Sequence, residues 1–287
     1  VLPTLRSEED VLRHLKEYLV RPDVPLPRLF ARVIASPTDG AFYRRQLAAL
    51  ARSGAERMAH RFIAGVTPEE ALATVARLRQ DGMAFSLDLL GEATSRDEQA
   101  DRYAQAYIDL IRRLGPTVET WAPCEQADQG ADVPMPRLNV SLKLSSLEPH
   151  FDAVNPEGSI QRCLHRLRPI LRAARAQRAF VNVDMEQYAI KDLTLAAFRQ
   201  VLGESEFRDV RDVGIVLQAY LRETADDLES LADWVRDRGT PVAVRLVKGA
   251  YWDYETFHAI QHGWPIPVWT QKWESDASYE RLARRLL

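Results

Sequence analysis

Apolar and polar residues follow two different periods along this chain. Up to about residue 82 the apolar positions have helical spacing, most clearly in "TPEEALATVARLRQDG", where Thr67 is the predicted N-cap, Glu70 completes a capping box and Gly82 ends the helix. From residue 83 onward, short apolar runs typical of buried strands each precede an amphipathic helical pattern. The five predicted strands lie in residues 83–91, 138–147, 179–186, 213–220 and 241–252.

Two local signals refine these boundaries. Ser95 and Glu98 form a second predicted capping box, which places the start of the helix after the first strand. Residues 115–137 are rich in Pro, Gly and Asp and are predicted as the one long irregular connection, an insertion between the first two strand–helix units.

Five strand-then-helix units in succession predict a parallel sheet with helices outside it. Each predicted strand carries a polar residue in or just after its second half, and no Gly-rich phosphate loop is present. Functional groups at the carboxyl ends of several strands favour a (β/α)8 barrel over an open doubly wound sheet. A barrel needs about eight strands. We therefore expect an incomplete barrel over residues 83–287, preceded by a helical arm over residues 1–82.

Composition narrows the functional class. Of the 287 residues, 46% are hydrophobic and 28% charged, and the net charge is −3. A nucleic-acid surface needs a basic bias, so no nucleic-acid partner is expected from this region. No apolar run reaches the roughly 18–20 residues of a membrane span. Cys124 and Cys163 lack metal-ligand spacing, and we expect two free thiols in a cytoplasmic protein.

The strand-end polar residues are the candidates for chemistry. Lys143 fits a strand-end lysine, a cation for a ligand, or a Schiff-base amine. Asp184, with Glu186 two residues on, either pairs with Lys143 or orients a substrate or cofactor. Gln218 either caps a loop or uses its double donor and acceptor character on the edge of a heterocycle.

Arg245 and Lys248 are an unusual pair at one strand end, in "VRLVKGAYWDYE". Two cations there indicate an anion or an electron-rich ligand, and Gly249 allows close backbone approach to it. The alternative is neutralisation by Asp184, Glu186 and Glu92, which still forms a dense polar network at one barrel mouth.

Glu255, His258 and His262 share a helical face, which fits either a metal trio or a solvated surface. We favour the solvated surface and expect no metal site.

Several motifs, in order, resemble one known family. "FSLDLLGEA", "SLKLSSLEPHFD", "NVDMEQY", "GIVLQAYLRE", "VRLVKGAYWDYE" and "TQKWESDASY" are similar to the proline dehydrogenase domain of the bacterial proline utilization A family, from about residue 60 to the end. The resemblance implies a distorted (β/α)8 barrel that binds FAD noncovalently. It also implies oxidation of L-proline to Δ1-pyrroline-5-carboxylate in proline catabolism, with hydride transfer from proline C5 to flavin N5 and electrons passed on to a quinone.

The same resemblance implies a cytoplasmic flavoprotein with peripheral contact to the inner membrane, where the quinone lies. The bifunctional members of the family carry a fused aldehyde dehydrogenase domain, so the resemblance also implies that domain in the full-length protein.

Site roles carry over position by position as implications of the resemblance. Lys143 would bind the proline carboxylate, Tyr251 would pack on the proline ring, and Glu92 would act as a gate. Arg245 and Asp184 complete the implied catalytic group. The implied cofactor-binding residues are Asp184, Met185, Gln218, Arg245, Val247, Lys248, Gly249, Ala250, Trp252, Lys272 and Ser275.

One departure from the family pattern concerns the substrate carboxylate. The family binds it with an adjacent Arg pair on its last barrel helix, but Arg284 and Arg285 follow "DASYE" and so fall on an earlier helix. We therefore expect a C-terminally truncated barrel that, by itself, binds FAD weakly and turns over proline slowly or not at all. The alternatives are a Schiff-base lyase or aldolase that uses Lys143, and an inactive barrel fragment.

Overall fold

The computed structural model describes residues 62–91, 94–130 and 134–287, together with a few isolated positions before residue 62. The chain divides into two compact units, Val1–Thr74 and Val75–Leu287. Most of the predicted helical arm, residues 1–61, lies outside the described residues. The helix predicted after Thr67 is α4, Pro68–Gln80. Thr67 Oγ1 accepts the Glu70 N–H as predicted, whereas the Glu70 carboxylate accepts from Val66 rather than from Thr67.

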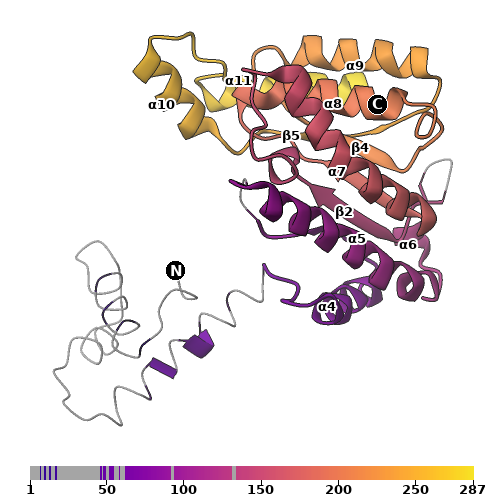
Figure 1. The fold of residues 1–287 in the computed structure, drawn as a ribbon. Helices are drawn as coiled ribbons and strands as arrows, with labels where there is room; N and C mark the ends of the chain where they lie inside the picture. The colour runs from indigo at the N-terminus through magenta and orange to yellow at the C-terminus, as the bar shows by residue number, and fades with distance from the viewer. Residues whose placement is uncertain are drawn as a thin grey trace. The chain divides into compact units, whose positions relative to one another are not determined.

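In the described part of the chain, five parallel strands form one sheet in the order β1-β2-β3-β4-β5, which confirms the predicted parallel sheet. Each strand alternates with helices along the chain (Figure 1). The strands are β1 (Leu87–Asp88), β2 (Leu138–Leu142), β3 (Ala179–Val183), β4 (Val213–Gln218) and β5 (Ala243–Val247). The helices that follow them are α5 (Asp97–Glu119), α6 (Glu125–Asp128), α7 (Pro156–Ala176), α8 (Lys191–Gly203), α9 (Thr224–Arg238), α10 (Trp252–His262) and α11 (Lys272–Leu286), with short 3-10 turns η2 (Leu144–Ser146) and η3 (Tyr188–Ile190).

Two predicted boundaries around α5 are wrong. Ser95 forms no capping box with Glu98; its N–H and hydroxyl both donate to the Gln99 side chain, and α5 begins at Asp97. The helix also continues through Pro116, so the irregular connection is shorter than predicted. Tyr107, Leu114 and Val118 are buried along this helix, and their packing outweighs the proline that local sequence treats as a helix breaker.

The sheet curls so that the residues on one face approach one another. Arg245 in β5 donates hydrogen bonds to Ser141 in β2 at 3.1 Å and to Ser86, just before β1, at 3.4 Å. Three strands separate β5 from Ser86 along the sheet, so a flat sheet would not allow this contact. The architecture is an α/β fold with a five-stranded parallel sheet, consistent with a TIM-like barrel.

Hydrogen bonds to buried charged groups anchor the segment that follows β3. Lys191, 2% exposed, donates to Asp192 at 2.7 Å and to Asp227 in α9 at 2.8 Å. The Tyr188 N–H donates to the buried Glu255 carboxylate of α10 at 2.8 Å. These contacts tie the segment after β3, at Tyr188 and Lys191, to α10 and α9.

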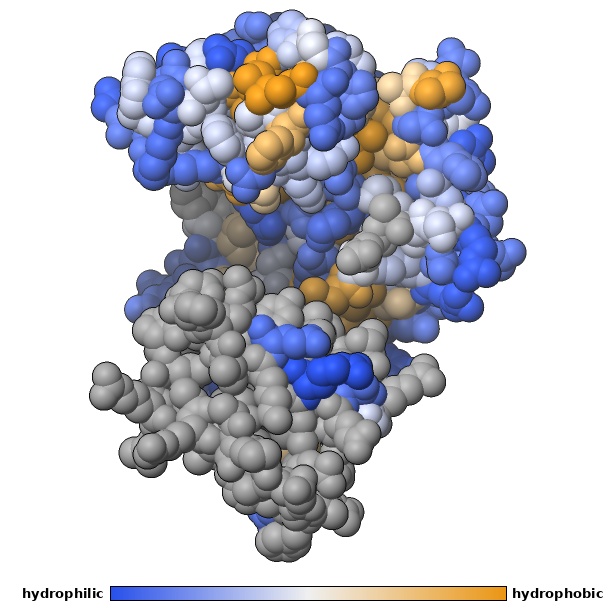
Figure 2. All heavy atoms as spheres, turned by 90° about the vertical axis from the view of Figure 1, so that its left-hand side faces the viewer, coloured by the Kyte–Doolittle hydropathy of each residue, from blue (hydrophilic) through white to orange (hydrophobic). Residues whose placement is uncertain are grey.

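Helix α10 presents apolar side chains to solvent. Phe257 is 67% and Ile260 61% exposed. Figure 2 turns this side of the molecule toward the viewer and shows hydrophobic residues among hydrophilic ones on its upper part. No helix in the described part of the chain combines the length and the apolarity that crossing a membrane requires.

Candidate functional site

Polar side chains gather where the carboxyl ends of the strands meet. Period-two alternation places Ser141 and Lys143 on the same side of β2, as it does Asn182 and Asp184 at β3. The backbone of Asp184 also joins the edge of β2, because its N–H donates to the Leu142 carbonyl at 2.8 Å. Strand pairing sets Ser141 opposite Asn182. The two strand ends therefore direct their polar residues into one space.

Lys143 lies between two carboxylates. Its ammonium nitrogen is 2.5 Å from Asp88 Oδ2 and 3.7 Å from Asp184 Oδ2. Burial acts to lower the pKa of Lys143, but the hydrogen bond and charge of Asp88, with the charge of Asp184, outweigh burial and raise it. The predicted pairing with Asp184 is present, with Asp88 as the nearer partner. A Schiff-base lysine needs a lowered pKa, so this environment disfavours the lyase alternative.

Arg245 and Asp184 form the second charged contact of the site. Arg245 Nη1 lies 3.3 Å from Asp184 Oδ1, and the two side chains are 39% and 20% exposed. The contact with Asp184 that the neutralisation alternative requires is present for Arg245. Because both side chains remain partly exposed, a ligand that approaches the carboxyl ends of the strands from solvent can contact the pair.

Two neutral residues that sequence reasoning missed hold Asp184 in place. Ser141 Oγ donates to Asp184 Oδ1 at 2.7 Å, and Asn182 Nδ2 donates to the same oxygen at 2.9 Å. Both are buried, Ser141 at 3% and Asn182 at 2% exposure. The signal that could have found them is their position two residues before Lys143 and Asp184, on the same strand face.

Gln218 carries an unsatisfied buried oxygen. Its Nε2 donates to the carbonyls of Glu186 at 3.2 Å and Met185 at 3.5 Å, which fixes the orientation of the amide. Its Oε1 has no partner among the described residues, although the residue is only 3% exposed. Buried acceptors without partners are uncommon, so a ligand that brings a donor to Gln218 would satisfy this atom.

The period-two argument predicted that Glu186 shares the face of Asp184, but Glu186 lies three residues beyond the end of β3 and bonds a different serine from Asp184. Its carboxylate accepts from the hydroxyl and N–H of Ser145, at 2.6 and 3.3 Å, and is 6% exposed. Burial raises the pKa of Glu186, although the Ser145 hydrogen bonds and the charge of Lys143 act to lower it.

Replacing Glu186 with glutamine is expected to stabilise the protein increasingly as pH rises. The pKa of Glu186 in the folded protein lies above its value in the unfolded protein, about 4.3. Between these two pKa values the folded protein binds more protons than the unfolded protein, so the free energy of unfolding falls as pH rises. Glutamine does not ionise and avoids this loss. Thermal unfolding of both proteins at about pH 4.5 and about pH 8 checks this. The control is Glu148→Gln, which loses ion pairs to Arg162 and Arg166 and should be destabilised at neutral pH. The prediction is contradicted if Glu186→Gln and the parent differ in unfolding temperature by the same amount at both pH values.

Lys248 faces a different partner from the one predicted. Its ammonium bonds to Asp276 in α11 and, among the described carboxylates, to neither Asp184 nor Glu186. Lys272 Nζ reaches the other oxygen of Asp276 at 2.7 Å. The predicted cofactor residues Lys248, Lys272 and Ser275 are thus brought together around the start of α11, and Asp276 is a member of this group that the sequence did not reveal.

The turn after β5 has the conformation that its glycine allows. Gly249 has φ +130°, and a Cβ there would lie 2.5 Å from the Tyr220 ring. The positive φ and the contact with Tyr220 both disfavour any residue with a side chain at this position. Tyr251 follows at the start of α10, where burial raises its pKa and the charges of Glu186 and Lys143 also act on it. Tyr251 therefore lies close enough to interact electrostatically with the strand-end cluster, which consists of Asp88, Lys143, Asp184 and Arg245.

The remaining predicted site residues line the same turn or lie outside the described part. Val247 is half-buried at the end of β5, Ala250 is exposed, and Trp252 donates its indole N–H to the Trp269 carbonyl at 2.8 Å. Glu92 lies outside the described residues.

The predicted solvated face of α10 is only partly correct. Glu255 is 4% exposed and turns into the fold, whereas His258 and His262 remain at the surface, with ring centroids 4.5 Å apart. Among the described residues, no group of three or more His, Cys, Asp or Glu side chains is placed to hold a metal ion. Cys124 and Cys163 are both free thiols, as predicted.

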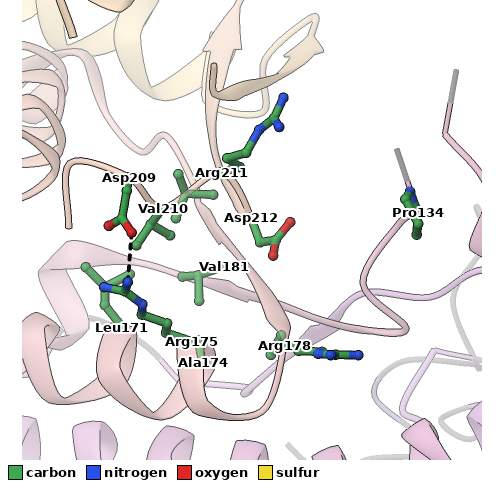
Figure 3. A pocket seen from close by; sticks show the side chains of 12 residues that line it. Pro134, Leu171, Ala174, Arg175, Arg178, Val181, Asp209, Val210, Arg211 and Asp212 are labelled. Carbon is green, nitrogen blue, oxygen red and sulfur yellow. Dashed lines mark hydrogen bonds and ion pairs between the residues drawn. The ribbon is translucent and has the colours of Figure 1, made fainter. Parts of the chain in front are cut away.

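A cavity of about 370 Å³ lies at the other ends of β3 and β4 (Figure 3). Arg175 at its wall pairs with Asp209 at 2.8 Å, and both apolar and charged side chains line it. Barrel enzymes place their reactive groups at the carboxyl ends of the strands, so this cavity is separate from the candidate site. It is lined by Pro134, Leu171, Ala174, Arg175, Arg178, Ala179, Val181 and residues 209–213.

Comparison with protein families gives two matches. The proline dehydrogenase family matches residues 71–287, and the proline utilization A N-terminal domain matches residues 1–62. The two matches leave only residues 63–70 uncovered.

Individual relatives agree with these matches. The bifunctional protein PutA of Escherichia coli (strain K12) is 29% identical over 231 residues, which are 80% of this chain and 17% of that protein. The proline dehydrogenase of Deinococcus radiodurans is 32% identical over 239 residues, 83% of this chain and 64% of that protein. The crystal structure of proline utilization A from Bdellovibrio bacteriovorus has a TM-score of 0.87 and 39% identity, covering 99% of this chain and 27% of that one. The chain therefore spans less than a fifth of the length of the E. coli relative.

Proposed function

Because the chain belongs to the proline dehydrogenase family, we propose that it contributes to an FAD-dependent enzyme that oxidises L-proline to Δ1-pyrroline-5-carboxylate. The observation that carries this proposal is the strand-end cluster. Two cations, Lys143 and Arg245, and two carboxylates, Asp88 and Asp184, gather at the partly exposed strand ends. On β4 of the same sheet, the Gln218 oxygen has no partner among the described residues.

The residues present fit a flavin. Gln218 Oε1 is a buried acceptor that needs a donor, which the ring N–H of a flavin supplies. Arg245 and Lys248 add positive charge, and Gly249 keeps the turn free of a side chain. FAD, when bound, supplies the hydride acceptor, while the protein positions it and tunes its electronics. We assign cofactor binding to Asp184, Met185, Gln218, Arg245, Val247, Lys248, Gly249, Ala250, Trp252, Lys272 and Ser275.

Two residues would act on the substrate, and a third on the cofactor. Lys143, held protonated by Asp88, would bind the proline carboxylate. Tyr251 would pack on the proline ring, since aromatic faces suit a compact apolar ring. Arg245 would keep a fixed positive charge where negative charge develops during oxidation. We retain Glu92 as a proposed gate on the strength of the family resemblance alone.

Further parts of the proposal concern organisation and partners. We propose a helical arm over residues 1–82, a barrel region over residues 83–287, and a fused aldehyde dehydrogenase domain in the full-length protein. Electrons would pass to a quinone by peripheral contact with the inner membrane from the cytoplasm. The exposed Phe257 and Ile260 of α10 support that contact, because they offer apolar surface to a bilayer.

The protein made from the complete coding sequence tests this function. We expect it to purify with bound FAD, to lose the oxidised flavin spectrum on anaerobic addition of L-proline but not D-proline, and to reduce an artificial acceptor dye with L-proline. Failure to bind FAD, or the absence of proline-dependent reduction, would overturn the proposal. Cosedimentation of the reduced protein with phospholipid vesicles tests the membrane contact, and absence of sedimentation contradicts it.

A further inference from the structure

A buried tyrosine on α5 lies behind the strand-end cluster. Tyr107 is 0% exposed, and its hydroxyl oxygen is 2.6 Å from the carbonyl oxygen of Ser141 and 3.2 Å from Asp88 Oδ1. The same oxygen accepts the Leu89 N–H at 3.3 Å. Tyr107 thus joins the end of β1 to the neighbouring strand β2 through one atom.

The hydroxyl can only act as a donor toward Asp88. Burial raises the pKa of Tyr107, and the charge of Asp88 raises it further, so the group stays protonated. The Ser141 carbonyl at 2.6 Å is its nearer acceptor and Asp88 Oδ1 at 3.2 Å its second, as in an unequal three-centre hydrogen bond. Asp88 then has one oxygen held by Tyr107 and the other directed at Lys143 Nζ at 2.5 Å.

Asp88 needs such a support. Its side chain is 38% exposed, and β1 is only two residues long, so few backbone contacts fix its position. Without the hydroxyl, the carboxylate could rotate into solvent and leave Lys143 with Asp184 alone. The orientation of the Lys143 ammonium therefore depends on a residue two contacts away.

We propose that Tyr107 is a positioning residue for the substrate carboxylate, acting through Asp88 on Lys143. This inference rests on the proposed function for the role of Lys143. The physical coupling of Tyr107, Asp88 and Lys143 does not depend on that role.

The chain offers a matched control one turn earlier on α5. Tyr103 donates its hydroxyl to the Leu89 carbonyl at 2.7 Å, and its ring stacks edge-on with Tyr107 at 5.2 Å between centroids. Tyr103→Phe deletes the same atom and loosens the same segment, but it removes no bond to Asp88. A merely structural role for Tyr107 would give both variants the same behaviour.

The experiment compares Tyr107→Phe, Tyr103→Phe and Asp88→Asn in the protein made from the complete coding sequence. We expect Tyr107→Phe to raise KM for L-proline about tenfold with kcat changed much less, as the loss of a hydrogen bond to a charged group does. Tyr103→Phe should leave KM within about twofold of the parent. Adding Tyr107→Phe to Asp88→Asn should give little further change, because both act on the same contact.

A second readout needs neither flavin nor turnover. Lysines of the flavin-free protein are reductively ¹³C-methylated, and the Lys143 resonance is assigned by its loss in Lys143→Arg. Its pKa should fall more in Tyr107→Phe than in Tyr103→Phe, which loses only the direct electrostatic effect of Tyr103 on Lys143. Unchanged Lys143 titration and unchanged KM in a folded Tyr107→Phe would overturn the proposal. If wild type does not oxidise proline, the proposed function fails while the titration still decides the coupling.

Discussion

Replacing Arg245 with methionine is expected to lower kcat for proline oxidation by about 100-fold, the scale of losing one preorganised charge at a reacting centre. Methionine keeps most of the side-chain volume but removes the cation that lies 3.3 Å from Asp184 and also bonds Ser141. Asp184 retains hydrogen bonds from Ser141 and Asn182. Folding should therefore be affected much less than turnover. Steady-state kinetics with an acceptor dye, together with thermal unfolding, separate the two effects.

The matched control for this change is Arg285→Met. Arg285 makes a two-pronged contact with Glu229 of α9 at 2.6 and 2.9 Å, and both side chains are about half exposed. Exposed ion pairs contribute little to stability, and this one joins α11 to α9 and includes none of the strand-end residues Lys143, Asp184 and Arg245. We expect unchanged kinetics, which is also the result predicted if Arg285 does not bind the substrate. Equal losses in the two variants would contradict the role assigned to Arg245.

The five strand–helix units were predictable because each places a short apolar run before a helical pattern, and the two periods differ clearly. Exact boundaries were not, since they depend on contacts outside the local sequence. Ser95 pairs with Gln99 instead of Glu98, and α5 passes through Pro116 because its buried face packs against the rest of the fold. Only Leu87 and Asp88 of the first predicted strand join the sheet.

The candidate site was predictable where a charge interrupts an apolar strand. Lys143, Asp184 and Arg245 are conspicuous for this reason, and the structure brings them together. Ser141 and Asn182 are small neutral residues that a strand buries without difficulty, so nothing in the local pattern separates them from ordinary core positions.

Local sequence patterns could not predict the helix residues that contact and support the site residues. Tyr107 has the spacing of a core residue on an amphipathic helix, and its hydroxyl gains meaning only when α5 packs behind β1 and β2. Asp276 lies 28 residues after Lys248, and the ion pair between them depends on how α11 returns to β5. Such contacts are set by tertiary packing, which spacing along the chain does not encode.

Replacing Gln218 with leucine is expected to weaken FAD binding by about 10- to 100-fold. The change removes the buried Oε1, which has no partner within the described part of the protein, and leaves the donor of the flavin ring unpaired. A buried polar group left unsatisfied costs about 1–3 kcal/mol, and about 1.4 kcal/mol corresponds to a tenfold change in Kd. Leucine is similar in size, so the effect does not come from a cavity. Titration of the flavin-free protein with FAD, followed by flavin fluorescence, measures Kd.

The orientation of Gln218 makes this prediction specific to an acceptor. Because Nε2 is occupied by the carbonyls of Met185 and Glu186, the amide has only its oxygen to offer a ligand. Gln105→Leu is the control, since Gln105 is exposed on α5 and donates to Asp109 on the same helix at 2.8 Å. It should bind FAD as the parent does. If Gln218→Leu also keeps the parent Kd, the Gln218 oxygen does not bond the flavin. That result would contradict the proposal that the end of β4 binds the cofactor.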